Sequence, residues 1–188
     1  KGERFAILSI SNNFYKVVVG GREGFVYKSR ANFEFNDSDK YFKVRKNNST
    51  VYDIRTGNYV NFGSLAKDQI FISDRISGNY HQINMGNFNG FVHTSNTEPL
   101  LKANLDNEVK SSNISGLFKV AKDTPIYDNS SGAFVKMGEL KQGTTYGFTS
   151  EGNNYHKVVF GSRSGIVNVK NTSRDIIEYS EYDINLGE

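Results

Sequence analysis

The chain has 188 residues, a formal net charge of +3 and 13% aromatic residues, with no Cys, no Trp and only 2 Pro. The absence of Cys excludes a disulfide framework, a thiolate nucleophile and a Cys-based metal site, and the aromatic content excludes a wholly disordered chain. No apolar run approaches the roughly 20 residues of a membrane-spanning helix, whereas 18 Gly among many Val, Ile, Tyr and Phe favour an all-β chain of short strands and tight turns.

Residues 1–33 are the second half of a repeated unit. Their opening aligns without a gap with residues 67–95 at an offset of 66, which places Phe14 on Tyr80. The first half of this copy is absent, so the sequence looks like a piece of a longer protein. A three-stranded remnant has little core of its own. We therefore expect it either to lean on its neighbour or to be completed by residues outside this sequence.

Two complete copies follow a linker at residues 34–40, and they span residues 41–98 and 117–173. Residues 51–92 align with residues 126–167 at an offset of 75, and 12 of these 42 positions are identical. Short β-type runs between turn signals are typical of a small barrel or sandwich. In the third copy such runs are expected at residues 118–121, 125–127, 133–137, 144–149, 156–160 and 165–169.

The segments outside the copies are residues 99–116 and 174–188. The first has four apolar residues at loosely helical spacing, so a short helix and an ordered linker are both open, and we favour the linker. The second is an acidic tail: from Ser173 onward the chain has a net charge of −4, against +7 for the preceding residues. Such a tail is usually a solvated end, although its Ile and Tyr residues are able to pack on the last unit.

One strand can be compared in all three copies, because it leads into the last hairpin of each. Side chains alternate faces along a strand. The core face is expected to carry Tyr15, Val17 and Val19; His81, Ile83 and Met85; and His156, Val158 and Phe160. The outward face is expected to carry Phe14, Lys16 and Val18; Tyr80, Gln82 and Asn84; and Tyr155, Lys157 and Val159. The outward ring in each copy either covers a neighbouring loop or unit, or forms the floor of a ligand groove.

The titratable residues shared by the copies favour structural roles. His81 and His156 lie on the core face, and no third ligand or carboxylate recurs near them at a metal-like spacing, so packing is expected and a metal site is not. Asp53 and Asp128 precede glycine turns, where a short carboxylate caps N–H groups. Paired-carboxylate hydrolysis needs two acids roughly 5 to 10 Å apart, and one acid is shared. No catalytic residue, metal or cofactor is therefore expected.

The pattern (Y/F)xxVxxG(x2-3)G(F/Y/I)V, preceded by a VYD turn, resembles the bacterial SH3-like (SH3b) domain over nearly all of residues 1–173. The resemblance implies tandem small SH3-like barrels, two complete and one incomplete at its N-terminal side. In this family such arrays usually sit beside a catalytic domain in secreted cell-wall hydrolases or surface proteins of Gram-positive bacteria, including Bacillus-type enzymes. A cell-wall hydrolase domain before residue 1 is thus one expectation. The family often carries Trp where this chain has the outward rings.

The resemblance implies a secreted or surface protein whose partner is a cell-wall polymer, peptidoglycan or teichoic acid. The expected contact residues are Phe14, Lys16, Tyr52, Tyr80, Tyr127, Tyr155 and Lys157. Linked weak sites gain avidity, and the positive repeat region favours polyanionic teichoic acid with an affinity that falls as salt rises. The alternative is a structural spacer or a docking module for another domain or a host protein. Nucleic acid is not an expected partner, because the basic residues form no run.

Overall fold

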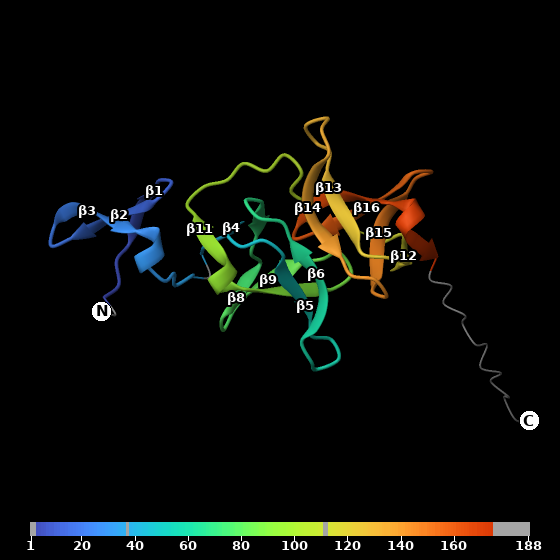
Figure 1. The fold of residues 1–188 in the computed structure, drawn as a ribbon, viewed down its shortest axis with the longest axis horizontal. Coiled ribbons are helices and arrows are strands. Elements are labelled where there is room, and N and C mark those ends of the chain that lie inside the picture. Colours follow the sequence, from blue (N-terminus) through green and yellow to red (C-terminus); the bar gives the residue numbers. More distant parts are fainter. Residues whose placement is uncertain (1–2, 37, 111–112, 175–188) are drawn as a thin grey trace, which may run out of the picture.

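The computed structural model describes residues 3–36, 38–110 and 113–174. Within these ranges the chain forms 18 β-strands, three short 3-10 helices and no α-helix, which confirms the all-β class. None of the helices in the described ranges is long and apolar enough to cross a membrane. Figure 1 shows the strands arranged in succession along an elongated molecule, with the first copy at one end.

The first copy, called unit 1 from here on, is a three-stranded antiparallel sheet followed by one 3-10 turn. Its elements are β1 (Ile7–Ile10), β2 (Phe14–Val19), β3 (Arg22–Tyr27) and η1 (Lys28–Arg30). The strands pair in the order in which they occur, and β2 and β3 form a tight hairpin.

The second and third copies, units 2 and 3, repeat one order of elements. Unit 2 contains β4 (Tyr41–Val44), β5 (Ser49–Asp53), β6 (Val60–Leu65), β7 (Ile70–Ile72), β8 (Arg75–Ser77), β9 (Tyr80–Asn84), β10 (Asn89–His93), η2 (Thr94–Asn96) and β11 (Thr97–Leu100). Unit 3 contains β12 (Gly116–Val120), β13 (Thr124–Asp128), β14 (Val135–Leu140), β15 (Thr145–Glu151), β16 (Tyr155–Phe160), β17 (Arg163–Asn168), η3 (Val169–Asn171) and β18 (Thr172–Arg174). All six strands expected in the third copy are present.

The hydrogen-bonded ladders do not close within either complete unit. One sheet has twelve strands in the order β18-β12-β15-β16-β17-β13-β14-β6-β5-β10-β9-β8, and β11-β4-β7 form a separate sheet. The larger sheet therefore runs through units 2 and 3 without interruption. Bulges bend it, for example between Val51 and Tyr52 where β5 meets β6. A closed ladder, as expected for an SH3-like barrel, is not found among the described strands.

The core follows the expected strand parity with three corrections, the first being Val19 of unit 1, which was expected on the core face and is 48% exposed. Met85 and Phe160 are fully buried at equivalent positions, as the alternation predicts. Gln82 and Val159 were expected on the outward face, yet both are buried. Gln82 accepts a hydrogen bond from Arg75 Nε at 2.7 Å. Val159 is covered by unit 2, because Gly86 packs over it.

Unit 1 leans on unit 2, which was one of the two outcomes expected for the half-copy. Tyr15 is 1% exposed, and its hydroxyl donates to Glu98 of unit 2 at 3.3 Å. Lys28 forms an ion pair with the same carboxylate at 3.0 Å. Burial and the neighbouring carboxylate of Glu98 raise the pKa of Tyr15 well above its ordinary value. The Phe33 ring closes this contact by packing edge-on to Tyr15 at 4.9 Å.

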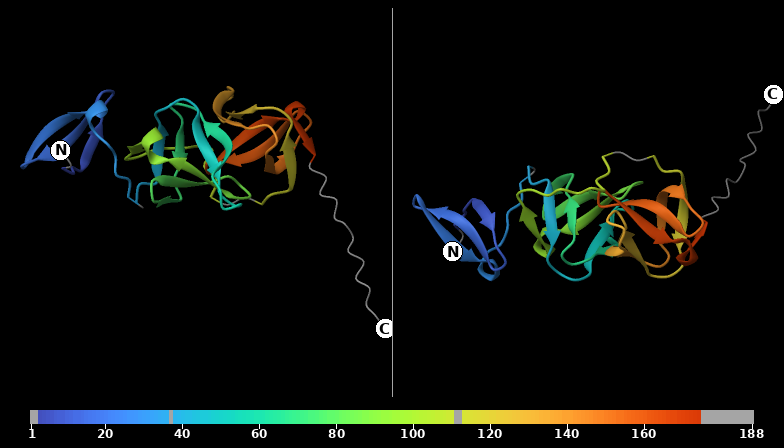
Figure 2. Two further views of the ribbon diagram at one scale, coloured as in Figure 1. Left: turned by 60° about the horizontal axis from the view of Figure 1, so that its bottom comes forward. Right: turned by 90° about the horizontal axis from the view of Figure 1, so that it is seen from above.

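Units 2 and 3 are joined through β6 and β14. These strands pair antiparallel, with Gly63 opposite Leu140, Ser64 opposite Glu139 and Leu65 opposite Gly138. In the repeat alignment Gly63 corresponds to Gly138, and Leu65 corresponds to Leu140. The pairing is therefore self-related: a local two-fold axis between Ser64 and Glu139 exchanges one unit for the other. Figures 1 and 2 show β6 and β14 side by side at this junction.

The two glycines are required by the closeness of the two backbones. A Cβ placed on Gly63 would lie 2.2 Å from the carbonyl oxygen of Glu139. A Cβ on Gly138 would lie 2.3 Å from the carbonyl oxygen of Ser64. Neither distance is tolerable for real atoms, so the contact explains why both copies carry glycine here.

At one repeat position, the side chain of unit 2 contacts unit 3 and the equivalent side chain of unit 3 contacts unit 2. Phe88 of unit 2 packs edge-on to Tyr146 of unit 3 at 6.2 Å between ring centroids. Arg163, the equivalent of Phe88, lies over Phe71 of unit 2 at 5.5 Å. Because Phe71 is the equivalent of Tyr146, the same two-fold axis relates the two contacts.

Arg163 also holds the junction through hydrogen bonds. The residue is 5% exposed. Its guanidinium donates to the Ile70 carbonyl at 2.8 Å, to Asn107 Oδ1 at 3.0 Å and to Asp128 Oδ2 at 2.6 Å. A weaker bond reaches Gln69 Oε1 at 3.3 Å. One side chain therefore connects unit 2, the linker and unit 3.

We predict that Gly138→Ala destabilises the protein by about 1–3 kcal/mol, because the added methyl group overpacks a backbone contact. Urea unfolding followed by circular dichroism measures the change. Gly24→Ala is the matched control, since a Cβ there meets no atom closer than 4.0 Å. Equal stability of Gly138→Ala and the wild type would show that β6 and β14 do not pair as described.

We predict that Arg163→Met lowers the free energy of unfolding by about 3–5 kcal/mol, because it leaves Asp128 and the Ile70 carbonyl without their buried partner. Thermal and urea unfolding measure the loss. Arg22→Met, at the equivalent and exposed position of unit 1, is the control and should change stability by no more than about 0.5 kcal/mol. A similar effect of both substitutions would contradict the assigned role.

Candidate functional site

Each unit presents a cluster of aromatic rings on the face formed by its last hairpin. In unit 2 the register places Tyr80 opposite His93, and Phe91 between Gln82 and Tyr52. The equivalent register in unit 3 places Tyr155 opposite Asn168, and Ile166 between Lys157 and Tyr127. In unit 1 it places Phe14 opposite Tyr27 and Lys16 opposite Phe25. Directly opposed side chains share one face of a sheet, so the seven predicted contact residues lie on these three faces.

The cluster of unit 2 consists of Tyr52, Tyr59, Tyr80 and His93. Tyr59 comes from the turn between β5 and β6, and its ring lies 5.2 Å from Tyr80 and 5.6 Å from Tyr52. His93 packs edge-on to Tyr80 at 5.0 Å. Burial and the neighbouring phenols raise the pKa of Tyr80. Three phenol rings and one imidazole thus gather at one surface position.

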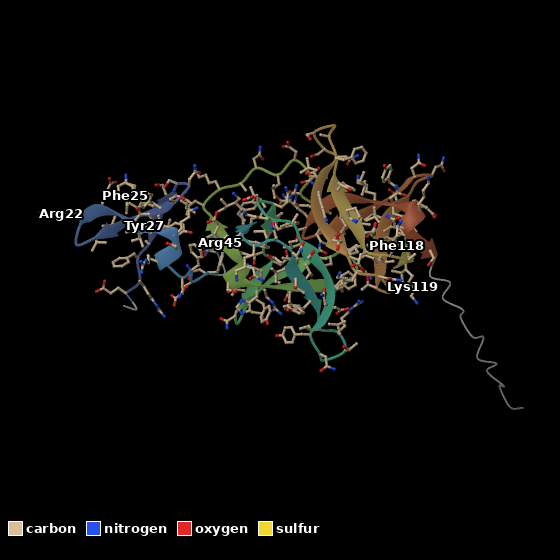
Figure 3. All side chains as sticks on the ribbon, viewed as in Figure 1. Arg22, Phe25, Tyr27, Arg45, Phe118 and Lys119 are labelled. Atoms are coloured by element: carbon tan, nitrogen blue, oxygen red, sulfur yellow. The ribbon has the colours of Figure 1, made fainter. Side chains whose placement is uncertain are left out.

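The clusters of units 3 and 1 are simpler. In unit 3, Phe134 from the β13–β14 turn lies 5.9 Å from Tyr127 and 5.7 Å from Tyr155. In unit 1, where the described residues form no strands equivalent to β5 and β6, Phe14 lies 4.3 Å from Tyr27 and 6.4 Å from Phe25. Figure 3 shows Phe25 and Tyr27 on β3 at the N-terminal end of the molecule.

The outermost ring of each cluster is largely in solvent. Tyr59, Phe134 and Tyr27 are each 57% exposed, and Phe25 is 68% exposed. Grouped apolar surface of this kind marks interaction sites more often than isolated exposed residues do. The predicted rings Phe14, Tyr80 and Tyr155 are half-buried beneath these outer rings and support them.

Polar groups beside the rings differ between the units. Lys16 forms an ion pair with Glu23 at 2.8 Å. Lys157 is exposed and lines a shallow depression of about 360 Å³, together with Asp128 and Ser130. The equivalent position in unit 2 is the buried Gln82. Units 1 and 3 therefore place an ammonium group beside the rings, and unit 2 places hydroxyl groups there.

The shared histidine is a core residue. The two ring nitrogens of His81 lie 3.1 Å from the Ser73 hydroxyl and 2.9 Å from the Thr97 hydroxyl, and Phe42 stacks on the imidazole at 4.1 Å. Burial lowers the pKa of His81 to about 3, so the ring is neutral in the folded protein at ordinary pH. His156 Nε2 lies 3.1 Å from the Thr172 hydroxyl, and the imidazole stacks on Phe118 at 4.9 Å.

The shared aspartates cap turns, as predicted. Asp53 Oδ1 accepts from the Arg55 backbone N–H at 2.9 Å, and Asp128 Oδ1 accepts from Ser130 N–H at 2.8 Å. Burial raises the pKa of Asp128, but hydrogen bonds from Ser130 and the charge of Arg163 leave it below its ordinary value. Among the residues the structure describes, no group of three or more His, Asp and Glu is placed to hold a metal ion.

Sequence reasoning missed the outermost rings. Tyr59 and Phe134 lie in turns, where strand parity gives no information, although both are aromatic at the repeat offset of 75. Phe25 and Tyr27 lie on β3, whose outward face was not compared among the copies. The repeat offset of 75 alone would have identified Tyr59 and Phe134.

Comparisons with known proteins add little to this geometry. No family model and no curated protein matches the chain. One solved structure, of NlpC2 from Trichomonas vaginalis, aligns with 71% of this chain and 47% of its own length, at 9% identity and a TM-score of 0.28. A likeness this low carries no argument about fold or function.

We predict that the free energy of unfolding falls by about 1.4 kcal/mol at pH 5.5 because of His81 alone. Its folded pKa of about 3 lies below the unfolded value of 6.5. Protons therefore bind the unfolded chain as the pH falls from 6.5 toward 3, and the stability that is present above pH 6.5 is lost. Urea unfolding at pH 7.5 and 5.5 measures this difference.

In the His81→Asn variant the free energy of unfolding should no longer show the fall between pH 7.5 and 5.5 that is assigned to His81, whatever the overall stability of the variant. His93→Asn is the control, because the equivalent residue Asn168 accepts from the Lys170 N–H as His93 accepts from the Ser95 N–H. An unchanged pH dependence in His81→Asn would show that His81 is protonated in the folded state.

Proposed function

We propose that this chain is a non-catalytic binding module that holds a larger secreted or surface protein on the Gram-positive cell wall. The repeated units act as SH3-like modules, and the ligand is peptidoglycan or teichoic acid. The observation that carries the proposal is the exposed aromatic cluster that recurs on the last hairpin of every unit. The exposed turn ring at equivalent positions of units 2 and 3, Tyr59 and Phe134, supports a shared binding role.

The chemistry of the clusters suits a polymer with both apolar and polar faces. Aromatic rings offer large contact areas with few rotatable bonds, and a phenol adds a hydroxyl that donates or accepts hydrogen bonds. A single ring cluster without an enclosed pocket binds the polymer with low affinity. Linked on one chain, such sites gain avidity. The excess positive charge of the repeats adds attraction to anionic teichoic acid, which salt screens.

The second candidate is a docking module for another polypeptide, and unit 1 favours it. Val19 is 48% exposed, whereas its equivalents Met85 and Phe160 are fully buried. Phe25 is 68% exposed and its equivalent Phe91 is 8% exposed. In unit 2 the strand β10 pairs with β5, and no strand within the described residues takes that place beside β3. The edge of β3 is thus suited to an added strand.

We predict that the protein sediments with purified Gram-positive cell walls and that Tyr80→Ala combined with Tyr155→Ala weakens this binding severalfold, because two ring clusters lose their central ring. Sedimentation with walls before and after removal of teichoic acid measures affinity at low and high salt. Leu101→Ser, which alters an exposed apolar residue in the linker, is the matched control.

The melting temperature of each variant is measured in parallel. Failure of the wild type to sediment with either wall preparation at low salt would overturn the proposal and leave the docking role. If the Tyr80 and Tyr155 double variant does not fold, wall binding is measured instead with variants of the exposed turn rings Tyr59 and Phe134. Full wall binding by those variants would also overturn the proposal.

A further inference from the structure

We infer that units 2 and 3 form a two-headed connector that holds two separate strands of wall polymer, instead of gripping one strand at two points. This inference rests on the proposed function, and it comes from the symmetry of the junction. The ring clusters of the two units are equivalent, so the two-fold axis that relates the units also fixes how the clusters are aimed.

The clusters lie at opposite ends of the β6–β14 pair. Tyr59 directly precedes β6, which begins at Val60, and Phe134 directly precedes β14, which begins at Val135. Because the two strands are antiparallel, their first residues lie at opposite ends. Figure 1 shows the β5–β6 hairpin projecting to one side of the molecule and the β13–β14 hairpin to the other.

The register also gives the separation of the clusters. The pair is centred on Ser64 opposite Glu139, and Tyr59 and Phe134 each lie five residues before this centre. At about 3.3 Å per residue the backbones of Tyr59 and Phe134 are at most about 33 Å apart along the strand direction, because the bulges in β6 and β14 shorten the span. A short oligosaccharide or stem peptide does not bridge such a gap.

The junction does not let the clusters turn toward each other. The backbones touch at Gly63 and Gly138, and the buried Arg163 binds the Ile70 carbonyl across the junction. A swivel would break the sheet hydrogen bonds and expose these groups. The two sites therefore stay at opposite ends of the β6–β14 pair, and each takes its own strand of the polymer.

The geometry is tested first, without ligand. The chain has no native Cys, so Tyr59→Cys and Phe134→Cys allow spin labels to be attached at these two exposed turns alone. Double electron–electron resonance should give one main distance between the two labels. Its expected value is up to about 33 Å plus the length of the label arms. A broad distribution, or a main distance far shorter than this, would overturn the rigid opposed arrangement.

The second test measures connection of two wall strands. Walls are immobilised, the protein is bound, and fluorescent wall fragments released by a muramidase are added. All proteins carry Phe25→Ser and Tyr27→Ser, so that unit 1 does not act as a second head. The intact pair of units should capture fragments on the walls, and Leu101→Ser serves as the control.

Removing one head separates binding from connection. Tyr59→Ser with Tyr80→Ala, or Phe134→Ser with Tyr155→Ala, should leave binding to walls detectable and reduce fragment capture to the level without protein. Wall binding without capture by the intact pair would overturn the inference and leave the proposed function standing. Capture by a one-headed variant would also overturn it. Absence of wall binding in every protein would instead remove the proposed function itself.

Discussion

The close approach of the β6 and β14 backbones at Gly63 and Gly138 is the constraint on which the rest of the structure depends. A sheet edge must be paired, covered or charged, and units 2 and 3 meet this requirement by pairing their edges with each other. The pairing is possible because Gly63 and Gly138 lack a Cβ where the partner carbonyl approaches. Once this register is set, the twelve-stranded sheet, the position of Arg163 and the direction of both ring clusters follow from it.

The position occupied by Arg163 shows how repeated units become unequal when they associate. Its equivalents are Phe88 in unit 2 and Arg22 in unit 1. Phe88 fills an aromatic contact with Tyr146, whereas Arg163 has hydrogen-bonding partners on both units and on the linker. Arg22 is exposed on β3, and no strand within the described residues pairs with the outer edge of β3. The neighbouring unit therefore determines whether this position carries packing, hydrogen bonds or neither.

The sequence was sufficient to predict what depends on local pattern. The all-β class, the six strands of unit 3 and the turn-capping Asp53 and Asp128 all follow from residue alternation and turn chemistry. The joining of two units into one sheet does not, because it depends on which edges meet. For the same reason Val159 was wrongly expected outside: its parity is outward, but unit 2 covers it. The rings predicted from parity were the inner members of each cluster, and the turn rings carry no parity signal.

The polar groups and the exposed rings of the units have different surroundings, and the proposed binding function rests on the rings. His81, Asp128 and Arg163 each have hydrogen-bond partners within the fold. The ring clusters have no such structural duty, since Tyr59 and Phe134 leave more than half of their surface in water. Exposed rings cost solubility and add little stability. Their recurrence at equivalent positions of units that face opposite ways is accounted for if each head meets a ligand of its own.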